Sequence, residues 1–109
     1  MIDWNRIAEL RDEVGAEDFE EVLDLFMSEV EDCLAQLDGT ASAQKLEEDM
    51  HFLKGSALNL GFRAFAELCQ NGETASAQGN TDAVDVAHVQ TLFTASKSEF
   101  YKDVTAKVA

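Results

Sequence analysis

The chain has 109 residues, 46% of them hydrophobic, which suits one small domain with a single core over residues 1–109. Eight basic against 22 acidic residues give a formal net charge of −14, so we expect neither nucleic-acid nor anionic-membrane partners. No apolar run reaches the roughly 20 residues that cross a bilayer, and the N-terminus has no signal-peptide pattern. We therefore expect a cytoplasmic protein.

The predicted elements are all helices, because apolar residues recur at helical spacing and glycines stand where the patterns stop. In chain order, we expect helices from Asp3 to Val14, from about Ala16 to Gly39, from a Thr40 or Ser42 cap to Gly61, from Phe62 to Gly79-Asn80, and from a Thr81 or Asp82 cap onward. Ser96 interrupts the apolar stripe of the last helix.

Each predicted helix has one apolar stripe that should face the core. The stripes consist of Trp4, Ile7 and Leu10; Phe19, Val22, Leu23, Phe26, Val30, Leu34 and Leu37; Leu46, Met50, Leu53, Ala57 and Leu60; Phe65, Leu68 and Cys69; and Val86, Val89, Phe93, Phe100 and Val104. Short connections between long amphipathic helices make neighbours antiparallel. We expect an all-α, up-down-up-down four-helix bundle with the short first helix capping one end.

The most informative motif is the run HFLKGSALNLG, from His51 to Gly61. Lys54 and Gly55 follow His51 by three and four residues, so all three share one face of the helix. The core stripe passes one residue away, at Met50 and Leu53, which leaves the imidazole at the margin of the buried face. About two-thirds of a 20-residue helix should precede His51.

These residue types suit phosphoryl chemistry. A neutral imidazole, with an unperturbed pKa of roughly 6.5, is a nucleophile near neutral pH and needs no cofactor of its own. The ammonium of Lys54 can attract phosphoryl oxygens. Gly55 costs about 1 kcal/mol relative to Ala inside a helix, so its presence suggests close approach of another protein.

This motif resembles the signature of histidine-containing phosphotransfer (HPt) domains of multistep two-component phosphorelays, His-x-x-Lys-Gly-Ser followed by Leu-Gly. The resemblance implies that His51 accepts phosphate, that Lys54 contacts the phosphoryl group and the receiver, and that Gly55 admits the receiver. Ser56 and Gly61 would support packing and the turn.

The resemblance extends into the next helix. Leu68-Cys69 is similar to an apolar pair of the family, and Glu73 stands where members carry Gln or Glu near the acceptor. Asn71-Gly72 occupies the place where many members have a bulky apolar residue just before that Gln or Glu. This pair should weaken the fourth helix.

For function, the resemblance implies a phosphocarrier rather than an autonomous kinase. His51 would take the group from a receiver phosphoaspartate and pass it to the aspartate of another receiver, with a hybrid sensor kinase upstream. The chain would need no cofactor, because the receiver would supply Mg²⁺ and the acidic pocket.

Partners should dock on the side of the bundle, over parts of the second and third helices. Glu47, Leu58 and Arg63 are candidate contacts. The acidic second helix keeps the protein soluble and monomeric, so docking should depend on apolar contact around His51 with Lys54 as local attractor.

Two other functions fit parts of the pattern. One is a helical adaptor that binds receiver or kinase domains through the same face without carrying phosphate. The other is a metal-binding bundle, because Glu48-x-x-His51 has the spacing of di-iron sites, although only Asp85-x-x-His88 could accompany it. We expect Cys33 and Cys69 to be core residues, and His88 to be solvated or hydrogen-bonded.

Overall fold

The computed structural model describes residues 1–108, and all of its regular elements are helical, which confirms the all-α prediction. The helices are α1 (Trp4–Val14), α2 (Phe19–Gln36), α3 (Ala43–Asn59), α4 (Arg63–Ala77), the short 3₁₀ helix η1 (Thr81–Ala83) and α5 (Val86–Val108). Within residues 1–108, no helix combines the length and apolar character needed to cross a bilayer.

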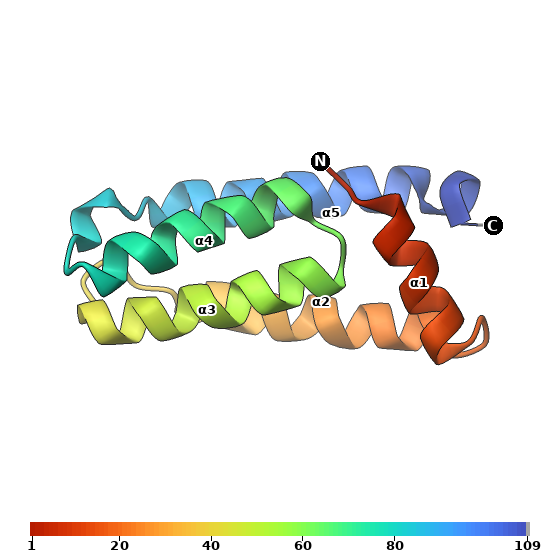
Figure 1. The fold of residues 1–109 in the computed structure, drawn as a ribbon, viewed down its shortest axis with the longest axis horizontal. Helices are drawn as coiled ribbons and strands as arrows, with labels where there is room; N and C mark the ends of the chain where they lie inside the picture. The colour runs from red at the N-terminus through yellow and green to blue at the C-terminus, as the bar shows by residue number, and fades with distance from the viewer. Residues whose placement is uncertain (109) are drawn as a thin grey trace.

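The helices form an elongated bundle of 43 × 20 × 19 Å. In Figure 1, α2 to α5 lie along the long axis and the chain reverses direction at each connection, while α1 lies across the end where α3 ends and α4 begins. There α1 contacts α2, α5 and the end of α3. This arrangement places the α3–α4 pair on one side of the bundle.

Polar side chains fix where three of the helices begin. The side chain of Asp3 accepts a hydrogen bond from the Arg6 amide at 3.2 Å, and Ser42 caps α3 by accepting from the Lys45 amide at 3.1 Å. The cap predicted at Thr81 or Asp82 is wrong, because that segment forms η1 and Asp85 caps α5 instead.

The predicted stripes supply most of the buried core, which runs through all five α-helices. Its fully covered members are Ile7, Val30, Leu46, Met50, Leu53, Ala57, Leu60, Phe62, Phe65, Cys69 and Phe100. Met27 is buried although the predicted stripe of α2 omitted it, whereas Val22 and Phe26 are only partly buried. Ser96 interrupts the apolar pattern in sequence but is itself buried.

The turn between α3 and α4 is held by the N-terminal segment. Gly61 has φ +67°, and its carbonyl accepts a hydrogen bond from the Asp3 amide at 2.6 Å. The Arg63 amide in turn donates to the Met1 carbonyl at 2.9 Å. A Cβ on Gly61 would lie 2.6 Å from the Asp3 carbonyl oxygen, so this close approach requires glycine.

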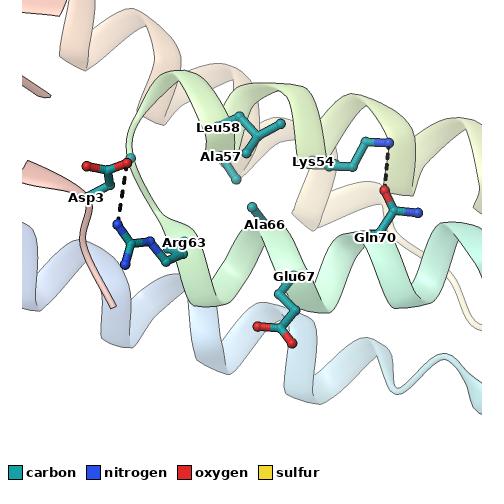
Figure 2. Close-up of a pocket in the computed structure, with 9 residues that line it drawn as sticks. Asp3, Lys54, Ala57, Leu58, Arg63, Ala66, Glu67 and Gln70 are labelled. Atoms are coloured by element: carbon teal, nitrogen blue, oxygen red, sulfur yellow. Dashed lines mark hydrogen bonds and ion pairs between the residues drawn. The ribbon is translucent and has the colours of Figure 1, made fainter. Parts of the chain in front are cut away.

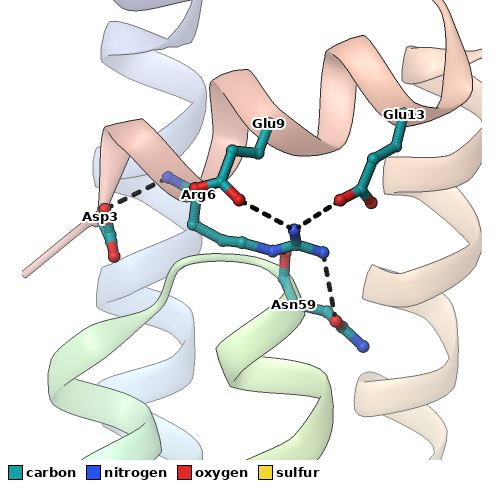
Figure 3. A network of polar contacts seen from close by, with 5 residues as sticks. All are labelled: Asp3, Arg6, Glu9, Glu13 and Asn59. Carbon is teal, nitrogen blue, oxygen red and sulfur yellow. Dashed lines mark hydrogen bonds and ion pairs between the residues drawn. The ribbon is translucent and has the colours of Figure 1, made fainter.

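Arg6 ties α1 to the C-terminal end of α3 (Figure 3). Its guanidinium donates to the backbone carbonyl and to the side-chain oxygen of Asn59, both at 3.3 Å, and to Glu13 at 3.2 Å. Glu9 lies 3.8 Å from the same guanidinium. Terminal carbonyls of a helix lack partners within that helix, so Arg6 satisfies one that α3 leaves open.

Candidate functional site

His51 lies at the midpoint of the 17-residue α3, not two-thirds along a longer helix as predicted. Its side chain is 70% exposed, at the margin of the buried face as expected. Nδ1 lies 2.9 Å from Oε2 of Glu73 on α4. The structure therefore brings together two predicted site residues that are 22 positions apart in the chain.

Lys54 lies one turn from His51 and shares Glu73 with it. Its ammonium is 2.6 Å from Oε1 of Glu73 and donates to Oε1 of Gln70 at 3.0 Å, as Figure 2 shows for Gln70. Gln70 in turn donates to the Thr74 hydroxyl at 3.1 Å. Sequence reasoning missed Gln70, which no motif marks, although it lies one turn before Glu73 on α4.

The charge on Glu73 determines which nitrogen of the neutral imidazole ring carries the proton. The hydrogen bond with Lys54 lowers the pKa of Glu73 most strongly, and the bond with His51 lowers it further, while desolvation opposes both. Glu73 is thus a carboxylate at neutral pH and can only accept, so neutral His51 carries its proton on Nδ1. Nε2 then holds the lone pair and is the nucleophilic nitrogen of the ring.

The Asn71-Gly72 pair does not break α4, which continues from Arg63 to Ala77. Gly72 is buried against Met50 of α3, and a Cβ at Gly72 would lie 2.8 Å from Sδ of Met50. Tertiary packing offsets the low helix propensity of glycine here. The pair therefore neither interrupts nor ends the fourth helix.

The outer face of α3 around His51 is open. Gly55 has no heavy atom within 4 Å of where a Cβ would stand, apart from its own neighbours along the chain and helix. Phe52 and Leu58 on this helix are 43% and 58% exposed, Arg63 is exposed, and Glu47 is half-buried. Of the predicted contact candidates, Leu58 and Arg63 are thus accessible, and Phe52, which was not among them, is accessible as well.

The segment that contains the motif carries basic but no acidic side chains. Residues 50–66 contain no Asp or Glu, although the chain has 22, and they include Lys54 and Arg63. A groove of about 300 Å³ extends from Lys54 to Arg63 between α3 and α4 (Figure 2). It is lined by Asp3, Lys54, Ala57, Leu58, Gly61, Arg63, Ala66, Glu67 and Gln70.

Other candidate residues are placed away from this chemistry. Ser56 and Gly61 are buried beneath the motif and at the turn. Burial raises the pKa of Cys33 to about 11 and that of Cys69 to about 12, so both thiols are protonated at neutral pH, and neither forms a disulfide. Cys69 is a buried core residue as predicted, whereas Cys33 is only partly buried. His88 is exposed at the start of α5. Residues 1–108 hold no group of three His, Cys, Asp or Glu that could bind a metal ion.

Comparison with known proteins gives one match that covers most of the chain. The family model described as Hpt domain matches residues 21–99, which include α3, α4 and most of α2 and α5. No curated protein and no solved structure matches the chain. Hpt domains take part in phosphotransfer in phosphorelays, with receiver and kinase partners. The match, with the His51 motif inside it, shows that this chain belongs to the Hpt domain family.

Proposed function

We propose that this protein accepts a phosphoryl group on Nε2 of His51 from a receiver phosphoaspartate and passes it to the aspartate of a second receiver. One observation carries this proposal: the exposed imidazole is held at Nδ1 by the Glu73 carboxylate, which leaves Nε2 as the nucleophile beside Lys54. Both transfers use the same face of α3, so one partner docks at a time on a monomer.

The proposed transfer balances without a further reactant. The Nε2 lone pair forms the N–P bond while the P–O bond to the donor aspartate breaks, and the released carboxylate keeps that electron pair. The Nδ1 proton stays in place, so the phosphorylated ring is cationic and faces the Glu73 carboxylate. In the second transfer the ring nitrogen is the leaving group. The receiver is expected to provide Mg²⁺ for the transferring group.

Lys54 has a distinct role in this proposal. At rest its ammonium is held by Glu73 and Gln70, close to the ring but on the side of α4. Its flexible stem can follow phosphoryl oxygens as the group approaches. Residues 50–66 add no carboxylate of their own beside Lys54, and the nearby Glu73 carboxylate is paired with Lys54 and His51, which limits local repulsion of a phosphoryl group.

The decisive experiment is transfer from a labelled phosphorylated receiver to the wild-type protein, to His51→Gln and to the control His88→Gln, which removes the other histidine. We expect label on the wild type and on the control only, stable in base and labile in acid as a phosphoramidate is. Digestion in base should release the Nε2-phosphorylated isomer. Label on His51→Gln, or the Nδ1 isomer, would contradict the assignment.

Two further variants separate transfer from docking. Lys54→Ala should slow transfer without abolishing it, whereas Gly55→Gln should mainly weaken receiver binding, because its side chain would fill open space on the docking face. If a broad panel of receivers binds the protein but none phosphorylates it, the adaptor function is supported instead.

A further inference from the structure

We propose that Gly72 is a positioning residue for phosphotransfer, because it sets the approach of α4 to α3 that lets Glu73 hold His51. The proposal rests on the phosphotransfer function, and it assigns to Gly72 a part in preparing the nucleophile. Glycine at this place provides no side chain and costs helix stability, so its effect must come from the space that it leaves.

The contact lies directly beneath the site. Met50 and Gly72 immediately precede His51 and Glu73 in the chain, so the buried Met50–Gly72 contact and the exposed His51–Glu73 contact belong to the same level of two antiparallel helices. A Cβ at Gly72 would stand 2.8 Å from Sδ and 3.1 Å from Cγ of Met50. Both distances are shorter than ordinary carbon contacts of about 3.5–4.0 Å.

A larger residue at position 72 has little free space to enter. Met50 is fully buried, and its neighbours Leu46 and Leu53 on the same stripe are fully buried as well. Interiors are close-packed, so an added side chain must displace Met50 or push α4 away from α3. The His51–Glu73 distance is 2.9 Å, and an outward shift of about 1 Å would take it beyond hydrogen-bond range.

Loss of that bond has a specific chemical result. Without Glu73 at Nδ1, the neutral ring is free to move its proton to Nε2, which removes the lone pair from the nucleophilic position. The cationic phosphorylated ring also loses its facing carboxylate. A misplacement of about 1 Å can slow a positioned reaction by up to about a hundredfold.

The test combines Gly72→Ala and Gly72→Leu with the exchange variant Met50→Ala/Gly72→Leu, which moves the large side chain to the other helix. The control is Asn71→Ala, an exposed neighbouring position on α4. Two properties are measured for each folded variant: the imidazole tautomer, from ¹⁵N chemical shifts of unphosphorylated protein, and the rate of transfer from a phosphorylated receiver at saturating concentration.

We expect Gly72→Leu to shift the tautomer toward the Nε2–H form and to slow transfer by about tenfold or more, with Gly72→Ala intermediate. The exchange variant should recover both properties, and Asn71→Ala should match wild type. If Gly72→Leu and Gly72→Ala fold and leave tautomer and rate at wild-type values, the positioning role is refuted. Recovery that fails in a folded exchange variant also contradicts it.

The tautomer measurement needs no receiver, so it distinguishes the two proposals. Wild-type protein that takes no label while its ring is the Nδ1–H form would overturn phosphotransfer but not the geometry. Label taken up at the same rate by wild type and by the folded Gly72 variants would overturn only the role of Gly72.

Discussion

Replacing Gly61 with Ala tests how the N-terminal segment holds the turn that follows the acceptor helix. The added Cβ would lie 2.6 Å from the Asp3 carbonyl oxygen and 3.3 Å from Cγ1 of Ile7. Because the nearest atom belongs to the backbone, no side-chain rotation can relieve the clash. The N-terminal segment must therefore move away from the turn.

The expected loss of stability has two parts. A left-handed φ of +67° costs a residue with a Cβ about 1–2 kcal/mol. Displacing the segment also breaks the Asp3–Gly61 and Arg63–Met1 backbone hydrogen bonds, each of which contributes about 1 kcal/mol. The sum is about 3–4 kcal/mol, a large part of the 5–15 kcal/mol that roughly spans the stability of small domains.

Gly79→Ala is the matched control, because Gly79 also has a positive φ, +78°, but no neighbouring atom lies within 4 Å of the place that a Cβ would occupy. Gly79→Ala should lose only the stability that a positive φ costs a residue with a Cβ, about 1–2 kcal/mol. Urea unfolding of both variants, followed by circular dichroism and by fluorescence of Trp4, measures the two losses. Equal losses would refute the argument that contact with Asp3 requires glycine at the turn.

Three further perturbations test the core, the α1 contact and the site. Leu53→Ala should lower the free energy of unfolding in urea by about 2–5 kcal/mol, because the side chain is fully buried. A loss below about 1 kcal/mol, roughly the cost of deleting one methylene group, would contradict its role in the core. Arg6→Ala should lower the free energy of unfolding by about 1 kcal/mol, because it removes the hydrogen bonds to Asn59. Arg6→Lys should recover only part of this loss, and full recovery would show that the charge alone matters. For Glu73, the lowered pKa means that its carboxylate stabilises the fold above its unfolded pKa, and that this contribution disappears as pH falls through the lower folded value. The stability difference between wild type and Glu73→Gln should therefore narrow from about pH 5 to about pH 3 in urea titrations, and a constant difference would contradict the role of the charge.

Much of this protein follows from local sequence patterns. The helices and most core residues were predictable, because the spacing of apolar residues along a helix depends only on the helix itself. The same local geometry put His51 at the margin of the buried face with Lys54 and Gly55 beside it. The cap at Asp85 was less predictable, since Thr81, Asp82 and Asp85 all have capping side chains.

Only the tertiary structure decided how the site is completed from α4. The sequence indicated Glu73 by resemblance, but it could not show that its carboxylate bonds His51 and Lys54, nor that Gln70 joins them. It also made Gly72 look like a weak point in a helix, whereas Gly72 is the place where α4 packs closely against Met50. Helix propensity describes a residue within its own helix, whereas the rotation and spacing of two helices depend on which side chains fit between them.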